Sequence, residues 1–379
     1  MSEETVFDVA IVGAGTMGMA AGAFLAQQGK KTLVIDAFDP PHANGSHHGD
    51  TRLIRHAYGE GRHYVRLVLR AQQLWEDLEK QTGYKVFDKT GVIGLGPEDS
   101  PFLLESIAAA NSYGLPLEIL SSGAIQDRWP GFTVPEHFIG CFEEQAGVLY
   151  SENAIRAYKK LALENGIHYV PNTPVQHIDI QDVHRVKIST AQGVFYAEKV
   201  IVTVGAWAKK LLPDLELPIQ PTRKAVGWFE APEMYNADQF PGFFVEGPEM
   251  MFYGFPSIDG TGVKVGRSDG GQPIDPDEQT QNFGEYEFDE GDLRRFLDLY
   301  MPQASGQLKQ GKTCLYTVSD DHNFIIDRHP DNEHVIFACG FTGHGFKFGS
   351  VMGEVLSQLA TDGHTEFDIA PFSLNRFKL

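Results

Sequence analysis

Cysteine is scarce in this chain: the 379 residues contain only Cys141, Cys314 and Cys339. Three widely separated thiols cannot build a disulfide framework, and they lack the close pairing of ligands that a zinc site requires. The acidic opening MSEETVFDV also lacks the basic and apolar segments of a secretory leader. We therefore expect a cytoplasmic protein without a structural metal.

Positive charge and long apolar runs are also lacking. The chain has 31 Lys and Arg against 51 Asp and Glu, a formal net charge of −20. Such an excess repels phosphate backbones and anionic lipid surfaces, so neither nucleic acid nor a membrane is expected as a partner. No apolar run approaches the roughly 20 residues that a membrane helix needs. The length predicts about two domains with ample core.

Glycine is abundant, and its most informative cluster lies in FDVAIVGAGTMGMAAGAFLAQQGKKTLVID, residues 7–36. The β-branched run at 9–12 predicts a buried strand of a parallel sheet. A helix of small and apolar residues follows and ends at Gly29, and a second strand covers 32–35. A strand, a glycine-rich turn, a helix and a strand in this order predict a dinucleotide site.

Three glycines and one carboxylate give this unit its chemistry. Gly13 forms the tight turn, Gly15 lets a pyrophosphate approach the backbone at the helix N-terminus, and Gly18 lets the helix pack closely on the strand. Asp36 follows the second strand, where it can accept hydrogen bonds from both ribose hydroxyls. These residues alone allow either NAD or FAD, and the alternative is a glycine-rich turn of another α/β unit.

Strands that run into glycines recur far along the chain. KVIVTVGAW at 199–207 and HVIFACGFTGHG at 334–345 both predict buried strands, and the second leads into a helix over 346–359. If these strands share a sheet with 9–12, the nucleotide domain is discontinuous in sequence. Other predicted elements are a helix over 150–166 with Ser151 as its N-cap, and strands over 167–170, 183–190, 225–229 and 251–255.

Charged residues gather in SHHGDTRLIRHAYGEG, residues 46–61. Asp50 and Thr51 are predicted to cap a short helix that carries Arg52 and Arg55 on one face, where two guanidiniums could hold a carboxylate or phosphate. The alternative is a solvated helix face whose arginines pair with Glu60 and Asp50. The adjacent histidines of this stretch point apart, which makes a poor metal pair.

Several single residues are ambiguous by themselves. Lys347 reads as a surface lysine, Lys264 as a lysine on the open face of a sheet or buried against a partner, and Cys314 as a small buried hydrophobe. Tyr253 and Tyr316 read as core or rim aromatics. Because no Ser–His–Asp set, metal-ligand set or Walker loop is visible, catalysis has to come from the cofactor.

Five segments in order along the whole chain, GAGTMGMAAG, NGSHHGDTRLIRHAYGEG, KTCLYT, FIID and GHGFKF, closely resemble the sarcosine oxidase and N-methyltryptophan oxidase group of D-amino-acid-oxidase-like flavoproteins. The resemblance implies an α/β fold with a Rossmann-like FAD-binding domain of the glutathione-reductase type and a β-rich, mixed-sheet substrate domain, both discontinuous. The boundaries that we expect are 1–85, 150–215 and 320–379 for the FAD-binding domain, and 86–149 and 216–319 for the substrate domain.

The resemblance also implies the activity. A flavoenzyme of this group oxidises the N-methyl C–N bond of sarcosine or a similar small secondary amino acid with O2, giving glycine, formaldehyde and hydrogen peroxide. We expect a monomer. The alternatives are an N-methyl-L-tryptophan oxidase or another N-methyl amino acid oxidase and, less in keeping with the motifs, a dehydrogenase with a protein electron acceptor. An NAD-linked enzyme or a nucleotide sensor on the same fold is a further alternative.

Residue roles follow from matching positions. The resemblance implies that Cys314 holds FAD covalently through its 8α-methyl carbon, and that His48, Thr51 and Arg52 contact the flavin. Lys264 matches the lysine that activates oxygen beside flavin N5. The catalytic residues that we expect are Lys264, Arg52, His48 and Tyr316.

The substrate pocket is implied in the same way. Arg55 and Lys347 match the ligands of the substrate carboxylate, Tyr253 and Tyr316 line the pocket, and the Gly343 carbonyl accepts from the amine. A cluster of cations disfavours a protonated amine, so no side-chain base is required. The same cations stabilise negative charge on reduced flavin and on superoxide.

Two positions depart from the group. Ser268 stands four residues after the lysine, where the group usually has a histidine, and Phe244 stands where the sarcosine-type enzyme has a methionine. A hydroxyl lacks the reach and charge of an imidazole, and an inward-pointing ring would shrink the pocket. We therefore predict a small substrate, with sarcosine preferred to N-methyltryptophan.

Overall fold

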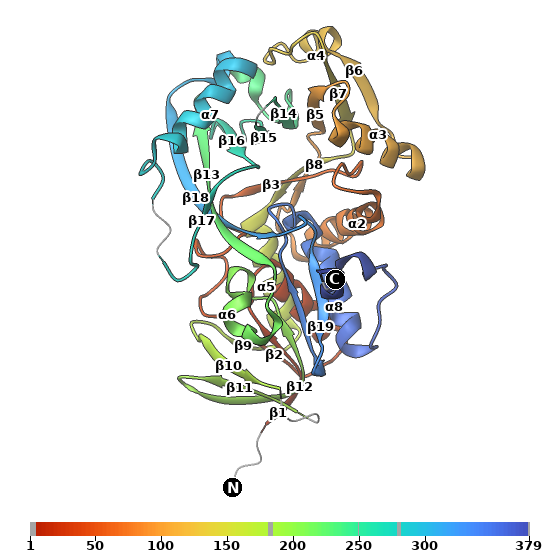
Figure 1. Ribbon diagram of the computed structural model, residues 1–379, viewed down its shortest axis with the longest axis vertical. Helices are drawn as coiled ribbons and strands as arrows, with labels where there is room; N and C mark the ends of the chain where they lie inside the picture. Colours follow the sequence, from red (N-terminus) through yellow and green to blue (C-terminus); the bar gives the residue numbers. More distant parts are fainter. Residues whose placement is uncertain (1–4, 181–184, 249, 279–281, 378–379) are drawn as a thin grey trace.

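Two large sheets lie toward opposite ends of the protein in the computed structural model, which describes residues 5–180, 185–248, 250–278 and 282–377 (Figure 1). Within these ranges one sheet has eight strands and the other nine, and a three-stranded sheet lies between them. This is an α/β fold with a mixed second sheet, as predicted.

The eight-stranded sheet has its central strands in parallel. In β1, Ile11 pairs with Ile201 of β12 on one side and with Val34 of β2 on the other, and Ile201 also pairs with Ile336 of β20. Strands from the start, middle and end of the chain are thus neighbours, which confirms the predicted discontinuous sheet. Its strands are β1 (Val6–Val12), β2 (Thr32–Ile35), β9 (His168–Val170), β10 (Val175–Asp179), β11 (Val186–Thr190), β12 (Gly193–Val202), β19 (Ile325–His329) and β20 (Asn332–Cys339).

The nine-stranded sheet is mostly antiparallel, with one parallel contact between β14 and β5. Its two longest strands, β13 and β18, form a ribbon that runs from this sheet toward the eight-stranded one (Figure 1). Residues on this ribbon can therefore reach the space between the sheets. The strands are β5 (Val92–Pro97), β6 (Glu118–Ser121), β7 (Phe138–Glu143), β13 (Ile219–Phe229), β14 (Gly242–Glu246), β15 (Met251–Phe255), β16 (Val263–Arg267), β17 (Gln272–Pro273) and β18 (Leu308–Ser319).

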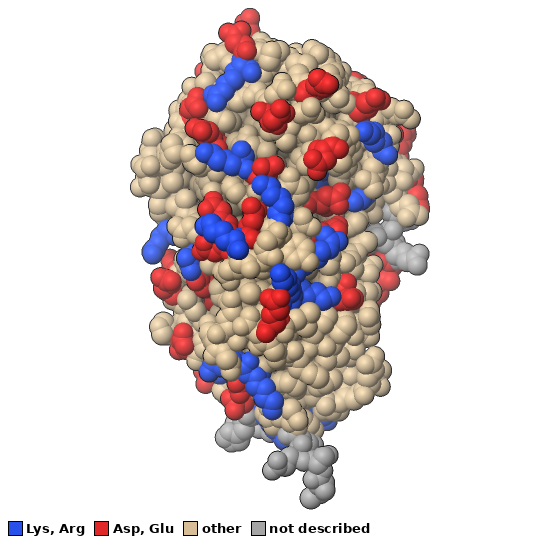
Figure 2. Space-filling model, turned by 180° about the vertical axis from the view of Figure 1, so that it is seen from behind, with Lys and Arg blue, Asp and Glu red and all other residues tan. Residues whose placement is uncertain are grey.

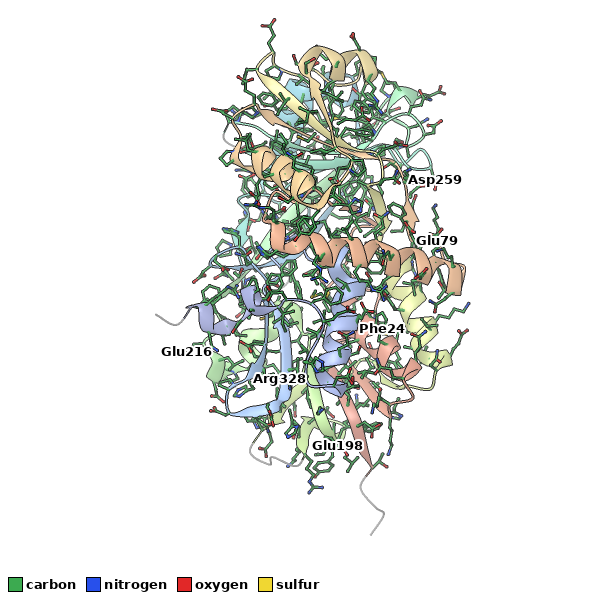
Figure 3. All side chains as sticks on the ribbon, turned by 90° about the vertical axis from the view of Figure 1, so that its right-hand side faces the viewer. Phe24, Glu79, Glu198, Glu216, Asp259 and Arg328 are labelled. Atoms are coloured by element: carbon green, nitrogen blue, oxygen red, sulfur yellow. The ribbon has the colours of Figure 1, made fainter. Side chains whose placement is uncertain are left out.

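Helices cover the parallel sheet and fill the middle of the molecule. Figure 3 shows α2 crossing between the two sheet regions, with Glu79 near its end. The middle also holds the three short strands β3 (Thr51–Ile54), β4 (Phe87–Asp88) and β8 (Gly147–Tyr150). The helices are α1 (Thr16–Gln27), α2 (Val65–Thr82), α3 (Pro101–Tyr113), α4 (Ser122–Arg128), α5 (Ser151–Glu164), α6 (Ala208–Leu211), α7 (Glu287–Tyr300) and α8 (Gly349–Thr361).

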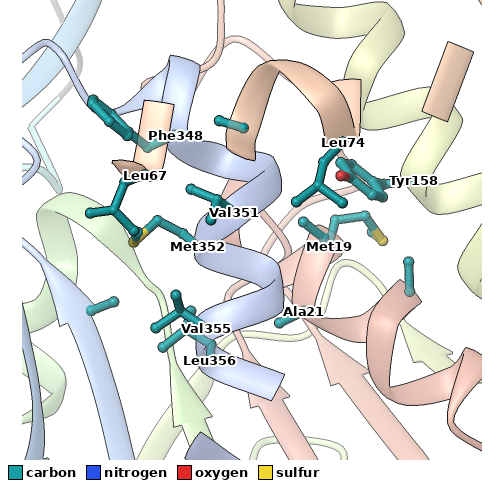
Figure 4. Packing of buried hydrophobic residues seen from close by; sticks show 14 of the residues in the cluster. Met19, Ala21, Leu67, Leu74, Tyr158, Phe348, Val351, Met352, Val355 and Leu356 are labelled. Atoms are coloured by element: carbon teal, nitrogen blue, oxygen red, sulfur yellow. The ribbon is translucent and has the colours of Figure 1, made fainter. Parts of the chain in front are cut away.

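The main core lies where α1, α2, α5 and α8 meet (Figure 4). Met19 of α1, Val351 and Met352 of α8 are fully buried there. A Cβ at Gly353 would lie 2.5 Å from the Cβ of Ala20, so α8 approaches α1 more closely than any larger residue would allow. This packing fixes the N-terminus of α1 relative to the residues that precede α8.

The predicted elements agree with the structure in most places. The strand predicted at 251–255 is β15, that at 225–229 is the end of β13, and the helix over 346–359 is a short 3-10 turn followed by α8. The strand at 167–170 is β9, and that at 183–190 is β11, although residues 183 and 184 lie outside the described residues. The domain boundaries stay a prediction.

The predicted N-cap of α5 is wrong. Ser151 is the first residue of the helix and Tyr150 is the N-cap, which makes no side-chain capping bond. The backbone N–H of Ser151 instead donates to the carbonyl of Asp50 at 2.8 Å. The chain enters α5 directly from β8, so tertiary pairing replaces side-chain capping here.

Charges of both signs are interspersed on the face seen in Figure 2. The net charge of −20 therefore does not gather there into a single acidic field. Among the described residues, none of the helices has the length and apolar character needed to cross a membrane.

Candidate active site

A cavity of about 1060 Å³ joins the glycine-rich turn to the end of the β13–β18 ribbon. It begins at Gly13, Gly15 and Asp36 and extends to Cys314 and Tyr316. One continuous space thus has both a phosphate-type cradle and a thiol in its lining. Further lining residues include Arg52, His47, Gly343 and Phe346.

The three fingerprint glycines occupy the positions that a dinucleotide requires. A Cβ on Gly13, whose φ is +97°, would lie 2.6 Å from the carbonyl oxygen of Thr203, and one on Gly18 would lie 1.9 Å from that of Gly13. A Cβ on Gly15 would meet no atom within 4 Å, so this residue faces open space at the N-terminus of α1. Free helix N–H groups beside an open glycine suit a pyrophosphate.

Asp36 directly follows β2 and lines the cavity. One oxygen accepts from the backbone N–H of Ala14 at 2.6 Å and the other from that of Phe38 at 2.8 Å. Burial raises the pKa of Asp36 to about 6, although both N–H groups oppose the shift. The carboxylate is held rigidly and keeps lone pairs for two hydroxyl donors.

The helix predicted to carry both arginines does not form. Residues Thr51–Ile54 are the strand β3, in which Arg52 pairs with Leu149 of β8, and Arg55 follows the strand. Side chains three apart on an extended chain do not share a face, so the two guanidiniums separate. The apolar residues of this segment pair with a partner strand almost 100 residues away, which local spacing could not reveal.

Arg52 is bound by backbone carbonyls at the cavity wall. Its guanidinium donates to the carbonyls of Ser46, Thr51 and His48 at 2.8, 2.7 and 2.7 Å. The side chain of His48 lies 3.5 Å from Glu152, and the neighbouring His47, not His48, is among the residues that line the cavity. The flavin contact expected of His48 stays a prediction.

Lys264 on β16 is fully buried at 2% exposure, which decides between its two interpretations. Its ammonium donates to the Gly49 carbonyl at 2.6 Å, the Thr51 carbonyl at 3.1 Å and the Thr51 hydroxyl at 3.0 Å. Burial and the nearby Arg52 lower the pKa of Lys264 well below its usual value. This buried ammonium is bound by neutral oxygens and lies near other cations. Together these groups give the region a positive potential.

Cys314 is a buried thiol on β18 that lines the cavity, so a group held in the cavity is within its reach. Burial raises the pKa of its thiol, and Arg52 and Lys264 oppose the increase. Its cross-strand neighbour on β13 is Lys224, whose ammonium is held by three backbone carbonyls. A thiol among cations forms a thiolate more readily than burial alone would permit.

Arg55 is enclosed by aromatic rings and by one carboxylate. Its guanidinium carbon lies 4.4, 5.1 and 4.9 Å from the ring centroids of Tyr58, Phe102 and Phe244. Glu60 accepts two hydrogen bonds from Nη2, at 2.8 and 2.6 Å. The predicted Arg55–Glu60 pair is confirmed, but the solvated surface is wrong because Arg55 is buried.

Lys347 is also buried, so its interpretation as a surface lysine is wrong. Its ammonium donates to the Tyr58 hydroxyl at 3.2 Å and to the His344 carbonyl at 3.0 Å. Burial and the nearby Arg55 lower the pKa of Lys347 to about 7. Tyr58 thus joins both candidate carboxylate ligands.

Two of the remaining predicted pocket residues, Tyr316 and Gly343, line the cavity. Tyr316 donates to the hydroxyl of Tyr253 at 3.1 Å, and Tyr253 pairs across strands with Phe244. A Cβ on Gly343, whose φ is +75°, would lie 2.2 Å from the Tyr316 ring. The structure therefore brings Tyr253, Tyr316, Gly343 and Phe244 together.

Some site residues escaped the sequence. Tyr58 and Lys312 lie within the quoted segments SHHGDTRLIRHAYGEG and KTCLYT but were given no role, and Glu143 lies outside every quoted segment. Glu143 accepts hydrogen bonds from the backbone N–H groups of His56 and Ala57, at 2.8 and 3.0 Å. A buried carboxylate in a strand was the one available signal.

A family model described as FAD dependent oxidoreductase matches residues 8–359. The chain belongs to this family. The dinucleotide of the glycine-rich turn is therefore FAD, and the NAD alternative is wrong. The cavity fits this group, since the phosphate cradle, the ribose-type carboxylate and the thiol lie along one continuous space. The enzyme is an FAD-dependent oxidoreductase.

Curated relatives extend over nearly the whole chain. It is 53% identical to the monomeric sarcosine oxidase of Arthrobacter sp. (strain TE1826), covering 99% of this chain and 98% of the relative. It is 55% identical to that of Bacillus sp. (strain B-0618), over 98% and 96%. The N-methyl-L-tryptophan oxidase of Yersinia pestis (strain Pestoides F) is 44% identical, over 98% and 100%.

Solved structures support the fold. The open form of NikD, an amino acid oxidase, has a TM-score of 0.85 at 22% identity, covering 97% of both chains. L-proline dehydrogenase from P. horikoshii has a TM-score of 0.88 at 20% identity, covering 99% of this chain and 98% of the other. At this identity the likeness concerns the fold alone.

Proposed function

We propose that this enzyme oxidises the N-methyl C–N bond of sarcosine and similar small secondary amino acids with O2, giving glycine, formaldehyde and hydrogen peroxide. The observation that carries the proposal is the pair of buried cations, Arg55 and Lys347, which Tyr58 joins; Lys347 directly follows Phe346, which lines the cavity. Relatives at 53% and 55% identity that are named monomeric sarcosine oxidase support it.

The two cations bind and orient the substrate. FAD, when bound, accepts the two electrons of the C–H bond and passes them to O2. Arg55 and Lys347 offer several donors to a carboxylate, which Arg55 can hold through two parallel bonds. The Gly343 carbonyl, next to Tyr316, is the acceptor for the amine. Binding at both ends of so short a molecule leaves the N-methyl group in one orientation.

The same cations remove the need for a side-chain base. Oxidation requires the neutral amine, and positive charges on Arg52, Arg55, Lys264 and Lys347 disfavour an ammonium among them. Burial, and after it the neighbouring arginines, lower the pKa values of both lysines, so these surroundings disfavour protonated amines. A substrate amine in this pocket loses its proton to solvent on binding.

Phe244 and Ser268 favour a small substrate. The Phe244 ring stacks edge-on against Phe102 at 5.2 Å between centroids and lies over Arg55. A Cβ on Gly94 would lie 2.1 Å from this ring, so it is packed too closely to retreat. Ser268 follows β16, and its hydroxyl donates to the carbonyl of Met251, the first residue of β15, at 3.0 Å. An indole side chain would have to displace the Phe244 ring.

Kinetics with two substrates tests the proposal. Peroxide production from sarcosine and from N-methyl-L-tryptophan is measured in air with the purified holoenzyme. We expect a higher kcat/KM for sarcosine. A higher value for the tryptophan derivative would favour the second candidate, which the relatives at 44% identity support. Reduction by substrate without peroxide in air would identify a dehydrogenase instead.

We further propose that Cys314 holds FAD covalently through the 8α carbon. Its place on the cavity wall among cations supports this attachment. After acid precipitation, the wild-type protein should stay yellow, whereas Cys314→Ala should release its flavin to the supernatant. Cys339→Ala, which changes a buried thiol of the parallel sheet, is the matched control and should keep its flavin.

Two further expectations rest on the relatives and composition. Relatives named monomeric support a monomer, which sedimentation of the holoenzyme tests. The scarcity of cysteine supports the expected cytoplasmic location, which fractionation of the producing cells tests.

A further inference from the structure

The turn Gly49–Thr51 is the binding site of the Lys264 ammonium. All three acceptors of that ammonium, two carbonyls and one hydroxyl, belong to Gly49 and Thr51. Lys264 is on β16 of the nine-stranded sheet, whereas the turn leads into β3 of the small sheet, whose first residue is Thr51. Whatever fixes the turn therefore fixes the ammonium.

The turn has an unfavourable backbone conformation. Asp50 has φ of +67°, in the left-handed region that residues other than glycine seldom adopt, and Gly49 has φ of +99°. Such a conformation persists only where surrounding contacts hold it. The Ser151 N–H donates to the Asp50 carbonyl and the Thr51 N–H to the Gly49 carbonyl, both at 2.8 Å, and the Asp50 side chain makes a further contact.

Lys312 supplies the side-chain contact. Its ammonium lies 3.0 Å from both carboxylate oxygens of Asp50. Lys312 is on β18, two residues before Cys314, so the ion pair ties the turn to the ribbon at the cavity wall. The ammonium groups of Lys312 and Lys264 both lie 5.1 Å from the ring centroid of Trp228, so one aromatic side chain contacts both cations.

We propose that Lys312 is a positioning residue for Lys264, and that its ion pair with Asp50 holds the Gly49–Thr51 turn so that both carbonyls face the Lys264 ammonium. The proposal rests on the assignment of Lys264 as the oxygen-activating group. Without the ion pair, the turn relaxes toward an ordinary conformation and its carbonyls turn away. The ammonium then loses its fixed place, which weakens its stabilisation of charge on reacting O2.

The effects on Lys264 of position and of charge can be separated, because Lys312 and Asp50 have opposite charges. The groups whose charges act on Lys264 are Arg52, Asp50, Cys314 and Lys312. Lys312→Met removes a like charge, which raises the pKa of Lys264, whereas Asp50→Asn removes an opposite charge, which lowers it. Both variants release the turn. A positioning role therefore predicts slower reoxidation by O2 in both variants. The pH profiles of reoxidation should shift in opposite directions.

Stopped-flow reoxidation tests this expectation. Holoenzyme is reduced photochemically without air and mixed with O2 between pH 6 and 10. Lys312→Met and Asp50→Asn should each reoxidise about 10-fold more slowly, since small displacements of a reacting group have effects of this order. Lys312→Arg, which keeps the ion pair, should stay within about 2-fold of wild type. Lys309→Met, which changes an exposed β18 lysine bound to the Gly260 carbonyl, is the matched control.

Hydrogen exchange of the protein gives a readout independent of turnover. The amides of Thr51 and Ser151, which bond to the Gly49 and Asp50 carbonyls at 2.8 Å, should exchange faster in Lys312→Met and Asp50→Asn only. Wild-type reoxidation by Lys312→Met, or equally slow reoxidation by Lys312→Arg, would overturn the proposal. Normal reoxidation by Lys264→Met would instead overturn the oxygen-site assignment.

Discussion

Glu60 is already bonded to the Arg55 guanidinium, the group that we propose binds the substrate carboxylate. Both of its oxygens bond to Nη2 of Arg55, at 2.8 and 2.6 Å. The proposed substrate must therefore displace Glu60 or share Arg55 with it. Replacing Glu60 by Gln removes the competing charge at nearly the same size, so the variant should bind carboxylates more tightly.

The strength of the competition follows from the pKa of Glu60. Burial opposes ionisation, but Arg55, His344 and Lys347 lower this pKa from 4.5 to about 2. At 1.36 kcal/mol per pH unit, the fall corresponds to about 3 kcal/mol of preference for the ionised form. The side chain is 25% exposed, and Gln keeps a neutral hydrogen bond to Arg55, so we expect about 1–2 kcal/mol to be released. This predicts a roughly 5- to 30-fold lower KM for sarcosine.

The assay is steady-state kinetics at pH 8 with a matched control. Glu105→Gln breaks the exposed pair between Glu105 and Arg62, 3.0 Å apart, and should leave KM unchanged. The Glu60→Gln protein should also be less stable without ligand, because Arg55 is then a buried cation without a carboxylate partner. Acetate should restore the stability by binding to Arg55. An unchanged or higher KM would show that Glu60 does not compete for Arg55.

Glu60 also predicts a pH dependence of stability. Its pKa is depressed in the folded protein, so it contributes stability above about pH 4.5 and loses that contribution as the pH falls toward 2. Acid unfolding of Glu60→Gln should therefore show a smaller loss over this window. An identical acid transition in both proteins would contradict the ion pair.

Two further predictions concern the same pocket. Glu143→Gln should raise KM about 10-fold with little change in kcat, because Glu143 accepts from the two amides after Arg55, and the exposed neighbour variant Glu144→Gln should have no effect. Acetate binding, followed by the flavin spectrum, should weaken as the pH rises through about 7, because the Lys347 pKa lies there, and Lys347→Met should abolish this dependence. The free protein should become more stable over the same rise, since the unfolded chain still binds the proton that Lys347 loses.

The parallel sheet and its glycine turn were predictable because their signals are local. The run at 9–12 is apolar without interruption, and Gly13 and Gly18 are required by backbone atoms only a few residues or one strand away. Each element of this unit is indicated by a hydrophobic period, a turn residue or a cap, and each of these signals involves residues that are close in sequence. The predicted discontinuity also held, because each strand repeated the same pattern.

The site was less predictable because its contacts are distant in sequence. Local spacing placed Arg52 and Arg55 on a helix, but pairing with β8 makes the segment a strand. Lys347 was interpreted as a surface lysine, and the burial of Lys264 was left open, because burial depends on neighbours from other elements. The expected roles of the site residues came from the family resemblance. Their geometry depends on contacts between segments that are distant in sequence, as the Lys312–Asp50 pair illustrates.

The cations of this pocket differ in how their charge is compensated, and that difference suits their proposed roles. Arg55 is paired with a carboxylate, so the exchange of Glu60 for a substrate carboxylate leaves the local charge unchanged. Lys264 is held by neutral oxygens, so no carboxylate bonds to its ammonium and cancels the charge that it carries when protonated. An exchangeable partner suits a binding group and neutral partners suit an electrostatic catalyst, because a carboxylate beside Lys264 would cancel the field that stabilises reduced oxygen.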